Sequence, residues 1–399
     1  MIKKMKILRS IYHYLWAIAA AVVFGFPAKK MFVLGITGTK GKTTSVYLIH
    51  HILESAGRKA AMLSTAEIKI GKETEKNLTG NTMPGRFFIQ RFLKEALRTG
   101  CRYAIMEVTS QGVLQHRHQF IKWGAAAFTN LKPEHIEAHG GFENYREAKL
   151  KFFRYAKKNR EAFFLINKED ENAEYFIKEA EGKKVVLYSP SDAEEKKLAA
   201  RMLPGKINEA NIALAAAFAK EIGLSEEEIK KGIESFPGAP GRMEFVKREP
   251  FTVVIDYAYT PDSLEPVYEE LKKYLKGPEN KIITVFGAAG GGRDKWKRPT
   301  LGKIAAEFCK EIILTTEEPY DEKPEDIMED INGGIPKGKN VYKIIDRKEA
   351  IEKAMELAQE GDVIALLGKG AEPYIHSNGK KISWNEKEAA EEAIKKIIR

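Results

Sequence analysis

The stretch Val33-Leu-Gly-Ile-Thr-Gly-Thr-Lys-Gly-Lys-Thr-Thr44 decides how the first part of the chain folds. The apolar run from residue 31 to 34 predicts a short buried strand. Apolar residues at helical spacing, Val46, Ile49 and Leu53, predict a helix that begins near Ser45. Glycines fill the segment between the two. This order of strand, glycine-rich loop and helix start is typical of a phosphate-binding loop.

The glycine-rich segment offers what phosphate oxygens require. Glycine lets backbone N–H groups turn toward an anion, and the helix N-terminus adds its positive end. Lys42 would reach the β- and γ-phosphates, and the Thr43 hydroxyl would hold Mg²⁺. The spacing from Gly35 to Gly41 is one residue longer than usual, so a plain glycine-rich turn is the alternative. The predicted nucleotide contacts are Gly38, Thr39, Lys40, Gly41, Lys42, Thr43 and Thr44.

Composition limits the class of protein. The chain has 399 residues, 43% hydrophobic and 31% charged, which fits a globular protein of two or three domains. The net charge is +10, but the lysines are spread along the chain and often follow glutamates. We therefore expect solvated helix faces and no nucleic-acid partner. The two cysteines, Cys101 and Cys309, predict a reducing, cytosolic compartment.

The N-terminal segment is apolar between two groups of cations. Residues 11–26 are apolar, and six lysines or arginines flank them within residues 1–30. Three interpretations stay open: a helix docked on the first domain or a sister subunit, an interfacial membrane helix, and a membrane span. The segment is short for a span.

From residue 31 onward, predicted strands and helices alternate. This pattern predicts an α/β fold with a mainly parallel sheet in a P-loop ATPase-type central domain, residues 31–238. The segment Pro237-Gly-Ala-Pro-Gly-Arg242 predicts a domain boundary, and a second alternating series follows it. We expect a smaller, Rossmann-like α/β domain over residues 239–399.

Several polar residues follow predicted strands. Glu107 could reach a metal from a sheet edge, and His135 could bind one, although each is more often an ordinary loop residue. Lys149 reads by composition as a plain helix lysine. A second glycine-rich loop ends in the cations Arg293 and Lys295, which suggests an anionic ligand.

Together and in this order, these motifs resemble the Mur ligases, the ATP-dependent amino-acid ligases of peptidoglycan synthesis. The resemblance runs from about Val33 to the C-terminus, and the tripeptide synthetases are the nearest members. The matching stretches are Thr37–Thr44, Glu107–Ser110, Thr129–Leu131 with His135, Tyr145–Lys149, Gly241–Glu244, Asp256–Ala258 with Thr260–Asp262, Arg293–Pro299, and Gly368–Gly370 with Glu372.

The resemblance implies roles that the residues alone do not give. Glu107 and His135 match metal ligands, and Lys149 matches a lysine that carbon dioxide converts to a carbamate. Arg242 and Asp256 match nucleotide contacts, and Asn130 would line the site. The implied substrate contacts are Thr109, Ser110, Arg293, Lys295, Glu317, Glu318, Tyr320, Gly368 and Glu372.

Two departures from the family concern the substrates. We expect the chain to lack the N-terminal domain that grips UDP in the family, with the apolar segment in its place. The Asp-Asn-Pro-Arg of diaminopimelate enzymes is here Glu317-Glu-Pro-Tyr320. The arginine of that motif holds a distal carboxylate. We therefore expect lysine, ornithine or a small neutral amino acid to be added, although these acids could simply be solvated.

The implied reaction activates a carboxylate. ATP and Mg²⁺ would give an acyl phosphate, and an amino-acid amine would attack it to form an amide on a muramoyl-peptide acceptor. The alternatives are a folylpolyglutamate synthase-like or cyanophycin-type ligase, and a nucleotide-binding subunit without catalytic activity. The retained Lys42, Glu107, His135 and Lys149 count against a dead subunit.

Overall fold

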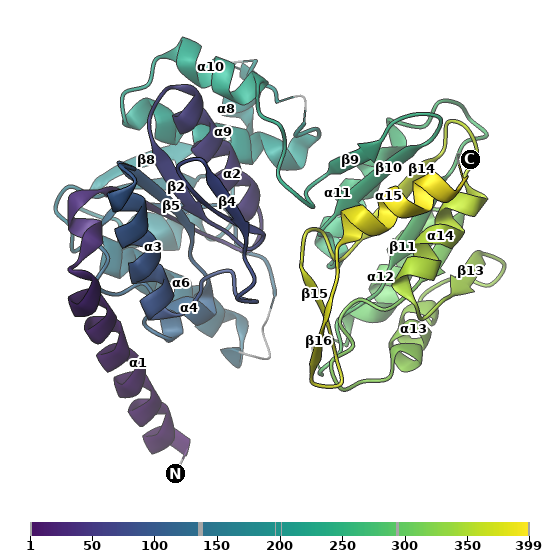
Figure 1. Cartoon of the computed structure of the whole chain (residues 1–399), viewed down its shortest axis with the longest axis horizontal. Helices are drawn as coiled ribbons and strands as arrows, with labels where there is room; N and C mark the ends of the chain where they lie inside the picture. Colours follow the sequence, from purple (N-terminus) through teal and green to yellow (C-terminus); the bar gives the residue numbers. More distant parts are fainter. Residues whose placement is uncertain (1, 135–138, 196, 201, 293–294, 398–399) are drawn as a thin grey trace. The chain divides into compact units, whose positions relative to one another are not determined.

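The computed structural model describes residues 2–134, 139–195, 197–200, 202–292 and 295–397 (Figure 1). The chain divides into two compact units, Met1–Pro237 and Gly238–Arg399. Each unit is an α/β structure with a mainly parallel sheet, as the sequence predicts. The two units are described separately.

In the described residues, unit 1 contains an eight-stranded sheet in the order β4-β3-β2-β5-β1-β6-β7-β8. Strands β2, β5, β1, β6, β7 and β8 are parallel, and β3 and β4 add an antiparallel edge. The strands are β1 (Phe32–Thr37), β2 (Ala60–Leu63), β3 (Glu67–Ile70), β4 (Glu73–Lys76), β5 (Tyr103–Glu107), β6 (Trp123–Phe128), β7 (Phe163–Asn167) and β8 (Lys184–Tyr188).

Helices cover both faces of this sheet, so its central strands are buried on both sides (Figure 1). Helices α2, α9 and α10 pack on one another, while α3, α6 and α7 contribute to a core that contains Val33, Phe128 and Phe164. The helices of the unit are α1 (Ile2–Phe24), α2 (Lys42–Ser55), α3 (Arg86–Arg98), α4 (Ser110–Leu114), α6 (Phe142–Ala156), α7 (Ala173–Glu179), α8 (Pro190–Glu195), α9 (Lys206–Glu221) and α10 (Glu226–Glu234).

Helix α1 lies along α3, and Gly25, at a φ of 73°, and Pro27 follow its end. A short 3₁₀ helix, Pro27–Lys30, then leads into β1. None of the helices in the described ranges combines the length and the apolarity that crossing a bilayer requires.

Unit 2 contains, in its described residues, a six-stranded sheet in the order β13-β12-β11-β14-β10-β9, in which only β9 is antiparallel. A small hairpin, β15–β16, lies apart from it. The strands are β9 (Glu244–Lys247), β10 (Thr252–Asp256), β11 (Ile282–Phe286), β12 (Glu311–Leu314), β13 (Asn340–Lys343), β14 (Val363–Leu367), β15 (Tyr374–Ser377) and β16 (Lys380–Ser383). The helices are α11 (Pro261–Lys272), α12 (Lys297–Phe308), α13 (Pro324–Asn332), α14 (Arg347–Leu357) and α15 (Glu386–Ile397).

One strand of unit 2 differs from the sequence expectation. The apolar residues Ile344 and Ile345 predict a strand over 343–345, whereas β13 covers Asn340–Lys343. This strand lies at the edge of the sheet, and its residues are half-buried or exposed without alternation. Its apolar pattern is therefore too weak to fix its position.

Candidate active site

The phosphate-binding loop lies where three parallel strands end together. Strand β1 pairs with β5 on one side and with β6 on the other. Parallel neighbours present their carboxyl ends at the same sheet edge, where ligands of such sheets bind. The loop after β1, Glu107 at the end of β5 and Asn130 after β6 therefore converge at this edge.

The glycines of the loop have different structural roles. Gly41 has a φ of 81° and is the N-cap of α2, and a side chain there would press on Asn211 Oδ1. A Cβ at Gly38 would overlap the Thr129 hydroxyl. Gly35 lies inside β1, where a Cβ would overlap the rings of Phe152 and Trp123. The loop glycines are thus Gly38 and Gly41, which accounts for the long spacing from Gly35.

Residues after β6 brace the loop backbone. Asn130 Oδ1 accepts a hydrogen bond from Lys40 N at 2.9 Å, and its Nδ2 donates to Lys40 O at 3.1 Å. The Thr129 hydroxyl donates to the same carbonyl at 2.7 Å, and Asn130 O accepts from Thr39 N at 2.8 Å. The side chain of Asn130 therefore fixes the shape of the loop.

Lys42 begins α2 and curls back over the loop. Its Nζ donates to the carbonyl oxygens of Thr39 at 2.6 Å and of Gly38 at 3.0 Å. A cation is thus held directly above the backbone that would surround a phosphate. Thr44, two residues further along α2, is buried.

Thr43 and Glu107 meet beside the loop. The Thr43 hydroxyl donates to Glu107 Oε1 at 2.9 Å, and Thr65 binds the same oxygen through its N–H at 2.9 Å and its hydroxyl at 3.2 Å. Glu107 is only 1% exposed. A hydroxyl and a carboxylate suit Mg²⁺, which usually keeps several waters and phosphate oxygens as its other ligands. Sequence reasoning did not single out Thr65.

The described residues contain no cluster of three or more His, Cys, Asp or Glu side chains placed to hold a metal. His135, the third residue expected at the metal, lies outside the described residues. The described part of the predicted metal set is therefore the oxygen pair of Thr43 and Glu107.

Lys149 reaches the same loop from α6. It is 1% exposed, and its Nζ donates to Gly38 O at 2.7 Å and lies 4.5 Å from the centre of the Tyr145 ring. Burial and the nearby Lys42 charge lower the pKa of Lys149 well below its ordinary value, and Glu134 opposes them. A lysine with a lowered pKa has a larger neutral fraction, and the neutral amine is the form that can act as a nucleophile.

Thr109 and Ser110 open α4 at the end of β5. Thr109 caps that helix, because its hydroxyl accepts from Gly112 N at 3.1 Å. Ser110 Oγ lies 3.1 Å from His139 Nε2. His139 was not predicted as a site residue. The signal that could have found it is its position four residues after His135 in a glycine-containing loop.

In unit 2, Asp256 shapes the loop that carries Arg242. The Asp256 carboxylate accepts from Met243 N at 2.7 Å and from Ala258 N at 2.8 Å. The Arg242 guanidinium lies 4.3 Å from the centre of the Tyr257 ring. Asp256 is buried at the end of β10, so it holds this loop to the edge of the sheet.

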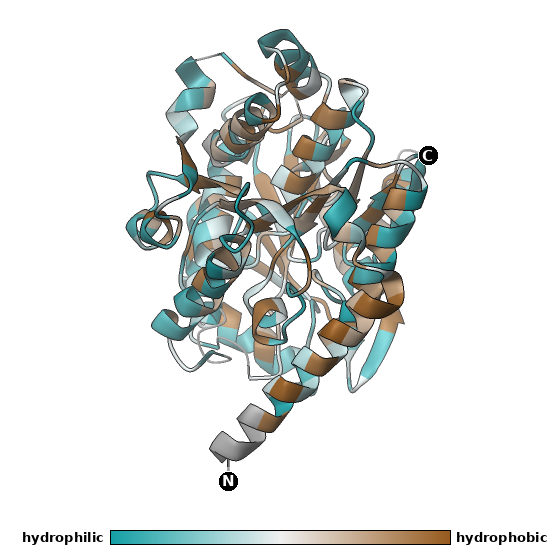
Figure 2. Ribbon diagram, turned by 90° about the vertical axis from the view of Figure 1, so that its left-hand side faces the viewer, coloured by the Kyte–Doolittle hydropathy of each residue, from teal (hydrophilic) through white to brown (hydrophobic). Residues whose placement is uncertain are grey.

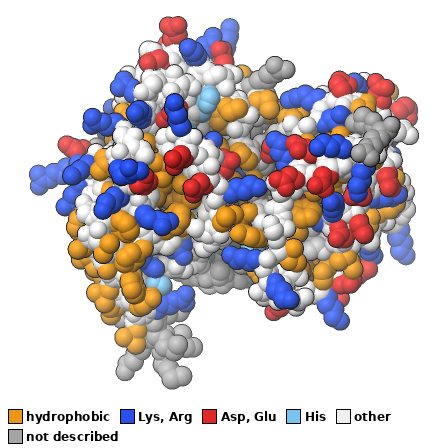
Figure 3. All heavy atoms as spheres, viewed as in Figure 1, with side chains coloured by type: hydrophobic (Ala, Val, Ile, Leu, Met, Phe, Trp, Pro, Cys, Tyr) orange, Lys and Arg blue, Asp and Glu red, His pale blue; other side chains and the backbone are white. Residues whose placement is uncertain are grey.

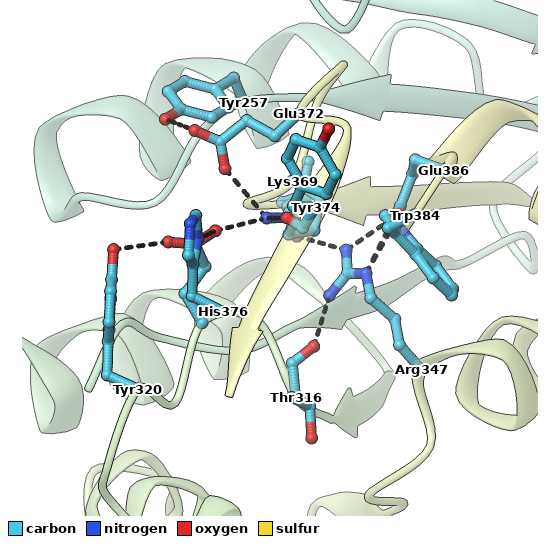
Figure 4. A network of polar contacts seen from close by, with 12 residues as sticks. Tyr257, Thr316, Tyr320, Arg347, Lys369, Glu372, Tyr374, His376, Trp384 and Glu386 are labelled. Carbon is cyan, nitrogen blue, oxygen red and sulfur yellow. Dashed lines mark hydrogen bonds and ion pairs between the residues drawn. The ribbon is translucent and has the colours of Figure 1, made fainter. Parts of the chain in front are cut away.

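A buried lysine organises the polar network at the end of β14 (Figure 4). Lys369 is fully buried, and its Nζ donates to Glu318 at 3.0 Å, to Glu372 at 2.9 Å and to Tyr374 O at 2.7 Å. The Tyr257 hydroxyl donates to Glu372. The sequence predicted Gly368 and Glu372 as site residues, but Lys369 is the residue that connects them to the β12 loop.

The Glu317-Glu-Pro-Tyr320 segment is more neutral than its composition suggests. Glu318 is bound by Lys369, by the Tyr320 hydroxyl at 2.8 Å and by His376 Nδ1 at 3.0 Å. Tyr320 also stacks on His376, with ring centres 5.5 Å apart. Glu318 is therefore a paired acid and not a solvated one.

Glu317 is the exception in this segment. It is 6% exposed, and its Oε2 has no hydrogen-bond partner in the described structure. Burial raises the pKa of Glu317 to about 7, although the Lys369 charge opposes this. A Cβ at Gly368, where φ is 98°, would lie in tight contact with this carboxyl group, 3.2 Å from Oε2.

The second glycine-rich loop is also held by ion pairs. Fully buried Arg298 binds Ala289 O at 2.9 Å and Glu322 at 3.0 Å, and Lys295 pairs with Glu322 at 2.9 Å. Arg293, predicted to contact substrate, lies outside the described residues. Glu322 thus acts as a structural partner of this loop and is not a free negative charge.

Known proteins resemble this chain. Two family models match the chain, the Mur ligase middle domain over residues 36–222 and the Mur ligase, glutamate ligase domain over residues 241–370. A UDP-N-acetylmuramoyl-L-alanyl-D-glutamate--2,6-diaminopimelate ligase from Aquifex aeolicus is 35% identical over 393 residues, which are 93% of this chain and 79% of the relative. UDP-N-acetylmuramoyl-L-alanyl-D-glutamate--2,6-diaminopimelate ligase 1 from Clostridium acetobutylicum is 36% identical over 407 residues, which are 96% of this chain and 82% of the relative.

Solved structures agree with the sequence relatives. A structure of a UDP-N-acetylmuramoyl-L-alanyl-D-glutamate--2,6-diaminopimelate ligase has a TM-score of 0.61 at 29% identity and covers 92% of this chain and 79% of that one. A folylpolyglutamate synthase of Mycobacterium tuberculosis shares the fold, with a TM-score of 0.67 at 14% identity over 91% and 96% of the two chains. Fold and site define an ATP-dependent ligase that forms carbon–nitrogen bonds. The chain belongs to the Mur ligase family.

Proposed function

We propose that this ligase adds an amino acid to a muramoyl-peptide acceptor through an acyl phosphate. The observation that carries the proposal is the meeting of Lys42, Thr43, Glu107 and Lys149 around one phosphate-binding loop. The relatives named above act, by their names, on UDP-N-acetylmuramoyl-L-alanyl-D-glutamate. A muramoyl dipeptide is accordingly the proposed acceptor.

The loop of unit 1 would hold the phosphates of ATP, which supplies the phosphoryl group that activates the carboxylate. Gly38 and Gly41 have positive φ angles, a conformation in which backbone N–H groups can turn toward phosphate oxygens, and Lys42 would exchange its bonds to Thr39 and Gly38 for bonds to those oxygens. Thr43 and Glu107, with His135, would hold Mg²⁺, which neutralises developing charge. Arg242 and Asp256 are proposed nucleotide contacts.

Lys149 would carry a carbamate. The ammonium form first loses one proton, and the neutral amine then adds to carbon dioxide, forms a nitrogen–carbon bond and releases a second proton. The product is an anion in place of a cation. The Lys42 charge repels the ammonium form of Lys149 and so lowers its pKa, whereas the carbamate would attract that cation. Carbamylation would therefore replace a repulsion beside the loop by an attraction.

The proposed contacts with the acceptor and the amino acid are residues that follow strands. Thr109 and Ser110 at the end of β5, with Arg293 and Lys295 in the second glycine-rich loop, would bind the acceptor. Glu317, Glu318, Tyr320, Gly368 and Glu372 would surround the amino acid.

The added amino acid would differ from that of the relatives named for diaminopimelate. The Tyr320 hydroxyl already donates a hydrogen bond to Glu318. Tyr320 also has no positive charge that could bind a distal carboxylate. Glu317 has a carboxylate oxygen without a hydrogen-bond donor, which a distal ammonium could supply. We therefore favour L-lysine or ornithine, and next a small neutral amino acid, over meso-diaminopimelate.

The proposed compartment is the cytoplasm, where ATP and muramoyl precursors meet. Residues 1–30 would add a contact beyond the active site, either with a membrane surface or with a second copy of the chain. The large apolar side chains of α1 that remain exposed support such a contact.

The proposal is tested by a matrix of acceptors and amino acids. Purified protein, ATP and Mg²⁺ are incubated with UDP-linked or lipid-linked muramoyl dipeptide and each amino acid, and product masses are recorded. The expected result is one acceptor whose mass rises by an amino acid less water, with one ADP formed per product. Nucleotide binding without an amide product from any pair would contradict the proposal.

A further inference from the structure

Helix α1 carries its large apolar side chains on the exposed face, which is the reverse of an ordinary surface helix in a water-soluble domain. Its inner face is small or polar: Ala17, Ala20 and Ala21 are buried, Ser10 Oγ lies 2.7 Å from His116 Nε2, and His13 accepts from Arg86 at 2.5 Å. An amphipathic surface helix ordinarily turns its apolar stripe inward.

The outer face of α1 carries large apolar side chains. Most of the α1 ribbon is coloured as hydrophobic (Figure 2). Leu15 is 57% exposed and Val22 is 60% exposed. The space-filling view shows hydrophobic side chains gathered over this helix (Figure 3). The exposed apolar residues of α1 are Leu8, Ile11, Tyr12, Tyr14, Leu15, Trp16, Ile18, Val22 and Val23. A contiguous apolar surface of this kind marks an interaction site.

Helix α3 extends this surface. Phe87 is 36% exposed and lies between two aromatic rings of α1, 5.5 Å from Trp16 and 6.3 Å from Phe24. Arg91 and Lys94 follow on α3 and are exposed. We call the exposed apolar residues of α1, with Phe87, the α1 patch.

The charged residues near the α1 patch are cations, which favours an anionic partner. The sequence contains no aspartate or glutamate before Glu54, so neither α1 nor the segment after it offers an acid. Arg9, Lys29 and Lys30 are exposed at the two ends of the helix. Two copies that paired through this surface would bring these like charges together, whereas an anionic surface would neutralise them.

We infer that the α1 patch docks on a membrane surface that contains anionic lipids. The helix would lie in the interface, with Leu15 and Val22 among the acyl chains. Trp16 and Tyr12 would lie at head-group depth, where such rings concentrate. The cations would contact phosphate groups. This places the ligase at a lipid surface by a contact that is independent of its catalytic site.

The test is flotation of the full-length protein with vesicles. We expect it to float with phosphatidylglycerol vesicles and not with phosphatidylcholine vesicles, and to be released by high salt. Lys29→Gln with Lys30→Gln should weaken partition about fivefold per lysine removed. The matched control is Lys72→Gln with Lys76→Gln, two exposed lysines on β3–β4, which should leave flotation unchanged.

A second pair of variants tests the apolar contact. Leu15→Glu with Val22→Glu should abolish flotation, while Ile345→Glu with Ile382→Glu makes the same change of charge at exposed apolar positions of unit 2 and should not. Thermal unfolding and nucleotide binding of each variant establish that the fold is retained. These readouts do not depend on ligase activity, so they can fail while the proposed function holds.

Two results would overturn the inference. One is equal flotation of wild type and Leu15→Glu with Val22→Glu. The other is wild type that does not float and is a dimer by light scattering, which the same substitutions convert to monomer. The second result would assign the α1 patch to a copy of this chain.

Discussion

Lys149 Nζ donates a hydrogen bond of 2.7 Å to the carbonyl oxygen of Gly38, so a buried amine on α6 touches the phosphate-binding loop. Lys42 donates to the same carbonyl at 3.0 Å. Two lysines thus share one backbone oxygen, and their repulsion adds to burial in lowering the pKa of Lys149. This arrangement joins the proposed carbamate to the proposed nucleotide site.

Replacement of Lys149 should abolish amide formation. Lys149→Ala removes the group that would carry the carbamate, and we expect kcat to fall by about 10²-fold or more. Short carboxylic acids should restore part of the activity, because they can supply an anion in the vacated space. The measurement is product formation with and without added acetate, with nucleotide binding as a control for folding. Full activity of the unrescued variant would show that no carbamate is needed.

Removal of the Arg347 side chain should strongly destabilise the chain. Arg347 and Glu386 are both 1–2% exposed, form an ion pair at 2.6 Å, and Arg347 also binds the carbonyl of Leu367 at 2.9 Å (Figure 4). Arg347→Ala leaves a buried carboxylate without its partner, at a cost of about 3–5 kcal/mol in the free energy of unfolding. Urea unfolding measures it.

The largely solvent-accessible pair of Lys353 and Glu356, with side chains 34% and 59% exposed, provides the control for Arg347. Lys353→Ala should change the free energy of unfolding by less than about 1 kcal/mol. Equal changes in the free energy of unfolding for Arg347→Ala and Lys353→Ala would show that the buried pair contributes no more to stability than the surface pair.

Acid should destabilise the fold through two buried histidines. Burial lowers the pKa of His50 to about 4 and that of His118 to about 3, whereas both titrate near 6.5 when unfolded. The unfolded chain therefore binds protons first as pH falls. Each histidine contributes stability that is present above pH 6.5 and is lost as the pH falls toward 4 for His50 and 3 for His118, by up to about 1.4 kcal/mol per pH unit.

The free energy of unfolding measured between pH 7 and pH 4 tests this titration. His118→Phe should flatten the decline, because an apolar ring replaces a group that protonates on unfolding. An unchanged slope in His118→Phe would mean that His118 does not contribute to the acid sensitivity.

Competition between amino acids should favour L-lysine over meso-diaminopimelate. Tyr320 cannot neutralise a distal carboxylate, and a carboxylate buried without a counter-ion costs several kcal/mol. Tyr320→Arg should shift the product ratio toward diaminopimelate, since a guanidinium binds a carboxylate through two hydrogen bonds. Tyr374→Phe, in the same network, is the control (Figure 4). A clear excess of the diaminopimelate product with wild type would contradict selection by this loop.

The sequence predicts the architecture well where burial is strong. The central strands of both sheets, such as β1 and β14, are buried on both faces and appear as apolar runs. The exposed strand β4, Glu73–Lys76, has no apolar residue and could not be found. The same limit explains why the edge strand β13 was misplaced.

The candidate site was predictable only as far as local motifs reach. Gly38–Gly41 form the loop and Lys42–Thr44 begin α2, and this continuous segment is recognised from its spacing. The contact of Lys149 with Gly38 spans 111 residues, and that of Lys369 with Glu318 spans 51. No local pattern encodes such pairings, which depend on the order of strands in the sheet. Glu317 looked like one of several solvated acids, yet it is the buried one without a complete set of hydrogen bonds.

The transfer of oxygen during turnover tests the central claim most directly. The muramoyl-L-alanyl-D-glutamate acceptor is labelled with ¹⁸O in its carboxyl groups and converted with ATP and L-lysine. In the proposed reaction a carboxylate oxygen bonds to the γ-phosphorus, and attack of the amine breaks the acyl carbon–oxygen bond. Mass spectrometry of the released phosphate should then find one ¹⁸O atom per amide formed. Unlabelled phosphate, or label in AMP with release of pyrophosphate, would contradict an acyl-phosphate ligase.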